Sequence, residues 1–162
     1  MENPGKLLSA ISLYIAERLC RAGFKPDAWL NTLAPTSPVI RALYKVVRAY
    51  WEIHQTLDGA IRMSASQIGS WLAPTDESET RHAFVQAIQA TRLLVPAYDN
   101  GALLFSHEAV YHCLLALAYL DDYERYWGEQ ILPSKVHRAF QDELPDEIVG
   151  IIHGLAYARH VA

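Results

Sequence analysis

Histidines and carboxylates at helical spacing are the residues that could do chemistry in this sequence. Glu108 and His112 lie four residues apart, and His153 and His160 lie seven apart, so each pair would share one face of a helix. Zinc takes three or four protein ligands, and neither pair supplies that number. The motif His-Glu-x-x-His does not occur in the chain. We therefore predict neither a metal site nor a cofactor.

A second group of carboxylates could act in acid–base catalysis. Asp121, Asp122 and Glu124 lie close together, next to Tyr123 and Arg125. Adjacent side chains on a helix point about 100° apart, so neighbouring carboxylates do not converge on one substrate. The sequence also lacks a phosphate-binding glycine loop, a Gly-x-Ser-x-Gly elbow and a cysteine–histidine nucleophile signature. We predict that the chain is not an enzyme. A helical enzyme subunit is an alternative that a bound metal or cofactor would support.

The composition is that of one compact globular domain. The chain has 162 residues, of which 51% are hydrophobic and 20% charged, and it can bury a sizeable core without disulfides. Cys20 and Cys113 match neither a disulfide framework nor zinc spacing, so we expect both to be buried as small apolar residues. No segment resembles a signal peptide or approaches the ~20 apolar residues of a membrane span. We therefore expect a cytoplasmic protein.

Apolar periodicity and capping residues predict a mainly α fold with one small β-hairpin. The helices are predicted at about 4–22, 38–57, 65–72, 77–91, 107–127 and 134–141, with a last one from 145 onward. Three side chains are expected to cap helices, namely Ser64, Asp76 and Ser106. Gly59 and Gly128 are expected to follow helix ends.

A hairpin is predicted between the fourth and fifth of these helices. Strands at 93–98 and 102–105 flank Asp99-Asn100-Gly101, and Asn-Gly strongly favours a tight hairpin turn. Pro96 has no amide proton to donate, so its strand must lie at a sheet edge. A further short strand is predicted at 60–63, which makes a small sheet possible.

The order of elements in residues 60–106 resembles a winged helix-turn-helix unit. The stretch MSASQIGSWL (63–72) resembles the first helix of the pair, and DESETRHAFVQAIQATRLL (76–94) resembles the recognition helix running into the first wing strand. The wing is then VPAYDNGALLFS (95–106). With its supporting helix the winged-helix-like unit covers 36–106. It lies between an N-terminal helical segment, 1–35, and a C-terminal helical segment, 107–162, which packs or dimerises, within one compact domain overall.

This resemblance implies a sequence-specific DNA-binding transcriptional regulator, such as a small repressor that forms a homodimer. In such a unit the second helix enters the major groove of DNA. Base contacts are implied for four side chains on that helix, namely Arg81, His82, Gln86 and Gln89. Phosphate contacts are implied for Arg92 and for a stripe of cations on the supporting helix, namely Arg41, Lys45 and Arg48. The wing tip would touch DNA through Tyr98 and Asn100.

The charge of the chain supports a different use of the same fold. The net charge is −4, whereas DNA-binding proteins usually show a basic surface. Glu77 and Glu79 in the first turn of the implied recognition helix suit the helix dipole but would repel phosphate. The alternative function is therefore a non-enzymatic protein-interaction module, such as an adaptor, an inhibitor or a subunit of a complex, which uses a winged-helix-like fold for protein contacts.

The C-terminal segment carries the features expected of a partner interface. Residues 108–162 contain four Lys/Arg and nine Asp/Glu, a balance of −5. Aromatic side chains recur at helical spacing in Tyr119, Tyr123 and Trp127, and such residues are enriched at interfaces. Gly150 and Gly154 begin a stripe of small residues that would let another helix approach closely, either within the chain or in a dimer.

Overall fold

The computed structural model describes residues 38–59, 61–72, 85–97, 102–128 and 130–161, and eight residues between 10 and 21. Those eight residues are helical. The later elements are α2 (Pro38–His54), β1 (Met63–Ser64), α3 (Ala65–Leu72), a helix at 85–90, β2 (Leu94–Pro96), β3 (Ala102–Phe105), α5 (Glu108–Trp127), η2 (Pro133–Lys135), α6 (Val136–Phe140) and α7 (Asp146–Val161). The prediction of a mainly α fold with a small hairpin is confirmed.

The three short strands form one antiparallel sheet in the order β1-β3-β2. Met63 pairs with Leu103, and Leu94 pairs with Phe105 on the other side of β3. Pro96 lies in β2, an edge strand, as its missing amide proton requires. The predicted turn at 99–101 lies outside the described residues. The sheet is small, and its buried side chains join the core that the helices build.

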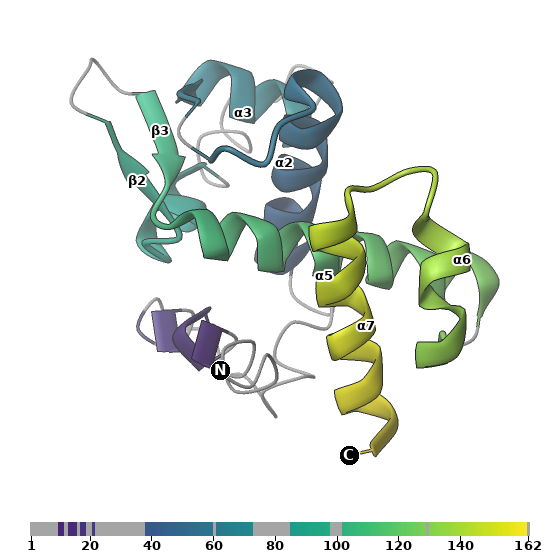
Figure 1. The fold of residues 1–162 in the computed structure, drawn as a ribbon. Helices are drawn as coiled ribbons and strands as arrows, with labels where there is room; N and C mark the ends of the chain where they lie inside the picture. Colours follow the sequence, from purple (N-terminus) through teal and green to yellow (C-terminus); the bar gives the residue numbers. More distant parts are fainter. Residues whose placement is uncertain are drawn as a thin grey trace.

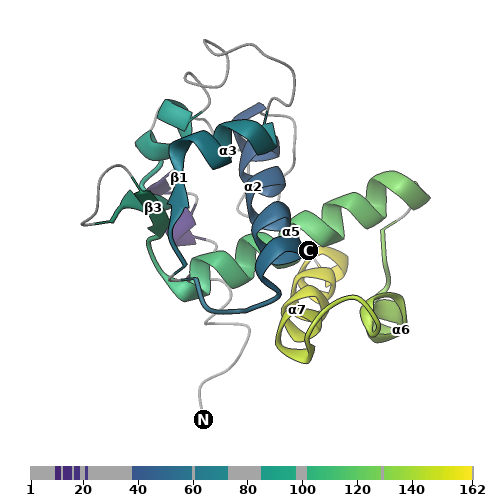
Figure 2. The same ribbon diagram turned by 90° about the horizontal axis from the view of Figure 1, so that it is seen from above.

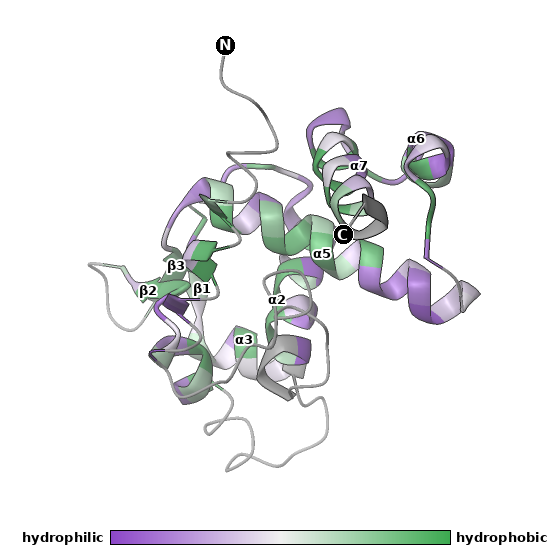
Figure 3. Ribbon diagram, turned by 90° about the horizontal axis from the view of Figure 1, so that it is seen from below, coloured by the Kyte–Doolittle hydropathy of each residue, from purple (hydrophilic) through white to green (hydrophobic). Residues whose placement is uncertain are grey.

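Helix α5 is the central helix of the molecule. Residues 113–118 are all buried, so this part of the helix is covered on every side. It packs against α2 on one side and α7 on another, and its start adjoins β3. Figures 1 and 2 show the sheet near the beginning of α5, α7 across its middle and α6 toward its end. In Figure 3 the middle of α5 is hydrophobic and its last turns are hydrophilic.

The helix at 85–90 ends in a compact turn that leads directly into β2. The Thr91 hydroxyl donates to the Ile88 carbonyl at 2.6 Å and accepts from the Leu93 amide at 3.2 Å. Thr91 is buried. Arg92 takes a left-handed backbone conformation with φ 60°. This turn fixes where the exposed side of the helix lies relative to the sheet.

One predicted helix end and one predicted helix cap are wrong. Helix α2 ends at His54 and not near 57, because Gln55 adopts φ 49° and its side-chain amide donates to the Trp51 carbonyl at 3.1 Å. Ser106 does not cap the long helix. The N-cap of α5 is His107, which makes no capping side-chain bond. Ser64 does cap α3, since its hydroxyl accepts from the Gln67 amide at 3.0 Å.

None of the helices formed by the described residues is both long enough and apolar enough to cross a lipid bilayer.

Candidate functional site

The residues predicted to contact DNA are only partly within the described structure. Arg81, His82, Tyr98 and Asn100 lie outside the described residues. On the helix at 85–90, Gln86 is exposed and Gln89 is half-buried, and Arg92 is exposed just beyond the helix end.

The helix at 85–90 has a buried and an exposed side. Val85 and Ile88 are buried on one side of it. Gln86 is exposed on the other side, and Gln89, four residues after Val85, is half-buried at the border between the two sides and three residues from Gln86. Two carboxamides and a guanidinium consequently reach the solvent at the end of one helix, next to the sheet.

The predicted cationic stripe on α2 faces the second half of α5. Arg41, Lys45 and Arg48 line a groove of about 340 Å³ together with Trp71 of α3 and with residues of α5 that include Asp121, Asp122 and Arg125. Arg41 and Lys45 are exposed, whereas Arg48 is half-buried.

Arg48 is already engaged within the protein. One guanidinium nitrogen lies 3.1 Å from a carboxylate oxygen of Asp122, and the other lies 4.0 Å from Glu52. Its guanidinium carbon also lies 5.1 Å from the ring centre of Tyr119. Burial raises the pKa of the Tyr119 hydroxyl, against the opposing effect of the Arg48 charge, so this hydroxyl stays neutral at physiological pH. The positive charge of Arg48 therefore serves the α2–α5 contact.

A second groove, of about 650 Å³, lies at the end of α5. We call it the aromatic groove, and the residues that line it are Arg48, Tyr119, Asp122, Tyr123, Tyr126, Trp127, Lys135, Arg138, Ala139, Phe140 and Glu143. Tyr123 packs against Phe140 of α6, with ring centres 5.6 Å apart. Trp127 and Tyr126 meet edge to face at 5.0 Å. The structure thus brings together Tyr119, Tyr123 and Trp127, the three aromatic residues predicted for a partner interface.

The far wall of the aromatic groove was not predicted. Lys135, Arg138 and Phe140 come from η2 and α6, which return to α5 after the loop that follows Trp127. The sequence signals in that region are Gly128, which ends α5, Pro133, which starts η2, and the predicted helix at 134–141. None of these signals gives the direction in which the chain turns back, so the groove could not be found from spacing alone.

The predicted stripe of small residues lies on α7. Gly150 is exposed, and a Cβ added there would meet nothing within 4 Å among the described residues. Gly154 is half-buried. The close approach of another helix is therefore not made at Gly150 by the part of the chain that the structure describes.

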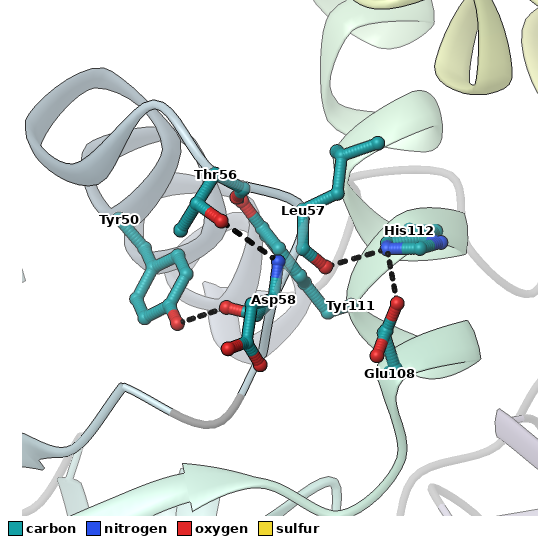
Figure 4. Close-up of polar contacts among 7 residues, drawn as sticks. All are labelled: Tyr50, Thr56, Leu57, Asp58, Glu108, Tyr111 and His112. Atoms are coloured by element: carbon teal, nitrogen blue, oxygen red, sulfur yellow. Dashed lines mark hydrogen bonds and ion pairs between the residues drawn. The ribbon is translucent and has the colours of Figure 1, made fainter.

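The Glu108–His112 pair has a structural role. The Nε2 atom of His112 lies 2.7 Å from the Leu57 carbonyl, to which it must donate, and 3.6 Å from a Glu108 oxygen (Figure 4). Nearby, the Tyr111 hydroxyl donates to the Thr56 carbonyl at 2.8 Å. Both residues bind the segment after α2 to α5. Among the described residues, no group of three or more potential metal ligands comes together.

Tyr50 holds the same segment from the other side. Its hydroxyl donates to the Asp58 carbonyl at 2.6 Å and accepts from the Ile61 amide at 3.2 Å. Burial raises the pKa of both Tyr50 and Tyr111, because neither side chain has solvent to stabilise a phenolate. These residues are therefore neutral anchors and are unsuited to proton transfer near neutral pH.

Comparisons of the chain with protein-family models, with curated proteins and with solved structures find no significant match. The function is therefore inferred from the two surfaces that the structure places at the two ends of α5, the helix at 85–90 with Arg92 and the aromatic groove.

Proposed function

We propose that the chain is a cytoplasmic DNA-binding transcriptional regulator built on a winged helix-turn-helix unit. The order α2, β1, α3, helix 85–90, β2 and β3 supports this proposal. So does the sheet order β1-β3-β2, in which the strand between the helices joins the hairpin. This arrangement is typical of winged helices, where the hairpin and the second helix of the pair can both reach DNA.

The observation that carries the proposal is the polar end of the helix at 85–90. Gln86 points away from the buried Val85 and Ile88, and the half-buried Gln89 lies at the border between the buried and the exposed side. A glutamine carboxamide can both accept from and donate to the edge of adenine in the major groove. Arg92 adds an exposed positive charge directly after the helix, where it could neutralise a phosphate.

The backbone of Arg92 adds independent support. Its φ of 60° is a left-handed conformation, in which an L side chain costs about 1 kcal/mol or more. Glycine or asparagine is the usual residue at such a position after a helix. An arginine held there at this cost is consistent with a use for its side chain.

The placement of negative charge agrees with DNA binding at the sheet end of the molecule. Eight of the nine acidic residues in 108–162 lie at position 121 or later. Apart from Glu129, which lies outside the described residues, they belong to the last turns of α5 and to the segments beyond it, which Figures 1 and 2 place away from the sheet. Charge this far from the sheet is largely screened at physiological salt, where the Debye length is about 8 Å.

The first test is binding of the purified protein to mixed genomic DNA fragments at low and at moderate salt. We expect a few fragments to be retained and their retention to weaken as salt rises, because phosphate contacts release counterions. Sequencing the retained fragments would give the recognised site. No retention at low salt would contradict the proposal.

Arg92→Gly separates DNA affinity from stability. Because glycine adopts φ 60° without strain, the free energy of unfolding should stay within about 1 kcal/mol of the original. Affinity for every retained fragment should fall, and the salt dependence should lose about one phosphate contact.

Gln86→Ala should instead cost ~1–3 kcal/mol of binding free energy on the preferred DNA site alone. Arg21→Gln, which removes an exposed cation paired with Glu17, is the charge-matched control and should change neither quantity.

The charge of the unit favours a second candidate function. Residues 60–107 have three Lys/Arg and four Asp/Glu, a balance of −1, which is unusual for a DNA-binding surface. A non-enzymatic protein-interaction module would use the same exposed side chains for a protein partner. This candidate predicts no DNA retention at any salt concentration. It also predicts a captured protein that Gln86→Ala or Arg92→Gly releases.

A further inference from the structure

Two large aromatic side chains stand exposed at the rim of the aromatic groove. Tyr126 is 80% exposed and Trp127 is 62% exposed. Together they leave on the order of 300 Å² of side-chain surface in water, since each such residue can bury 150–250 Å². Tyrosine and tryptophan are also the residues that most often dominate binding energy at protein interfaces.

The exposed aromatic side chains and the aromatic groove belong to one continuous surface. Trp127 and Tyr126 protrude from the last turn of α5, and both also line the groove that α6 completes. A surface that has both a projection and a matching hollow can pair with a copy of itself through a two-fold axis, since each copy then fills the hollow of the other.

The charges of the groove are also of both signs. Lys135, Arg138 and Glu143 all line it, and within the described residues none of these three has an ion-pair partner. In a two-fold contact the cations of one copy can face the carboxylate of the second. A different protein would need charges placed to match these cations and this carboxylate, whereas a second copy related by a two-fold axis already has both kinds of charge on the same surface.

We propose that the aromatic groove is a homodimer interface. Trp127 of one copy enters the groove of the second copy, and Lys135 and Arg138 of one copy face Glu143 of the second. A stable interface buries about 800 Å² on each partner, of which the two aromatic residues supply a substantial share. The two sheets would then lie at the far ends of the dimer, because the sheet adjoins the beginning of α5 (Figure 1) and the groove is lined by residues near its end. The dimer does not depend on the function proposed above.

The test is the molar mass of the full chain in solution, which light scattering measures over a series of protein concentrations. The original protein should shift from monomer to dimer as its concentration rises. Trp127→Ala should weaken association at least ~30-fold, as expected for a central interface residue. Tyr157→Ala is the matched control, because Tyr157 is 59% exposed on α7 but does not line the groove. This control should associate like the original protein.

Charge reversal distinguishes a two-fold contact from a general loss of solubility or folding. Lys135→Glu alone and Glu143→Lys alone should each associate more weakly, because like charges then face each other. An equimolar mixture of the two variants should regain association as a mixed dimer. All four residues replaced in these tests are exposed, so thermal unfolding of each monomer should be unchanged. A protein that stays monomeric at every concentration would overturn the proposal, as would a dimer that Trp127→Ala leaves intact.

Discussion

Three side chains of α2 and α5 hold the segment that leads from α2 toward the sheet. Tyr50, Tyr111 and His112 each bind a backbone carbonyl in the segment 56–58. The segment has no regular structure, so these three side chains supply partners for carbonyls in part-buried positions. A histidine–glutamate pair that resembles part of a metal site in the sequence is explained here by the same requirement.

The buried tyrosines predict a loss of stability at alkaline pH. A tyrosine in the unfolded chain loses its proton near pH 10, whereas burial raises the pKa of Tyr50 and Tyr111 in the folded protein. The unfolded state therefore binds fewer protons above pH 10. The stabilising effect is complete below that pH and is lost as the pH rises toward the folded-state pKa. Each such tyrosine contributes a slope of up to about 1.4 kcal/mol per pH unit.

Tyr111→Phe tests this expectation. At pH 7 the variant should lose about 1 kcal/mol, because the hydrogen bond to the Thr56 carbonyl is gone. Above pH 10 its free energy of unfolding, measured with urea, should fall less steeply than that of the original protein. Equal slopes for the two proteins would show that Tyr111 does not resist ionisation in the folded state.

Apolar periodicity and turn residues were sufficient to predict where most helices lie in the sequence, but not which helices pack against one another. Helix α5 and the strand at 102–105 were found at their observed positions because periodicity and turn residues act over a few residues. The end of α2 was missed because Gln55 stops the helix without a glycine. The aromatic groove was half predicted. Its α5 wall follows from tyrosine spacing, but the α6 wall depends on a long-range contact with Phe140.

Two glycines on the helices give a matched pair of opposite predictions. Gly128 follows α5 with φ 69° and donates its amide to the Glu124 carbonyl at 2.8 Å, whereas Gly150 lies inside α7. A Cβ at either position would meet nothing within 4 Å among the described residues, so packing does not decide the result. Gly128→Ala should lower the free energy of unfolding by about 1 kcal/mol, because alanine disfavours positive φ.

Gly150→Ala should raise the free energy of unfolding by about 0.5–1 kcal/mol, because alanine is the better helix former and loses less entropy on folding. Urea unfolding of the two variants side by side measures both signs. If Gly150→Ala were destabilising, another segment would have to occupy the space next to Gly150. That result would support the predicted close approach of another helix at this position.

At the scale of the whole molecule, α5 joins two groups of elements into one hydrophobic core. Buried residues of α2 and the sheet, and buried residues of α6 and α7, belong to the same cluster. The two candidate surfaces are consequently separated by a continuous apolar interior, with the polar helix end near the sheet and the aromatic groove near α6. A substitution at one surface can therefore be made without disturbing the contacts of the other.

This single core predicts that the chain unfolds in one cooperative transition. Leu115 is fully buried in the middle of α5, so Leu115→Ala should lower the free energy of unfolding by about 2–5 kcal/mol. For each protein taken separately, far-ultraviolet circular dichroism and tryptophan fluorescence should give the same unfolding midpoint as one another. The fluorescence reports on both ends, since Trp51 is buried in α2 and Trp127 ends α5. Leu132→Ala, at a side chain that is 41% exposed, is the control and should cost well under ~1 kcal/mol. Two separate transitions, of which Leu115→Ala moved only one, would mean that the sheet end and the C-terminal helices unfold as independent units despite their shared helix.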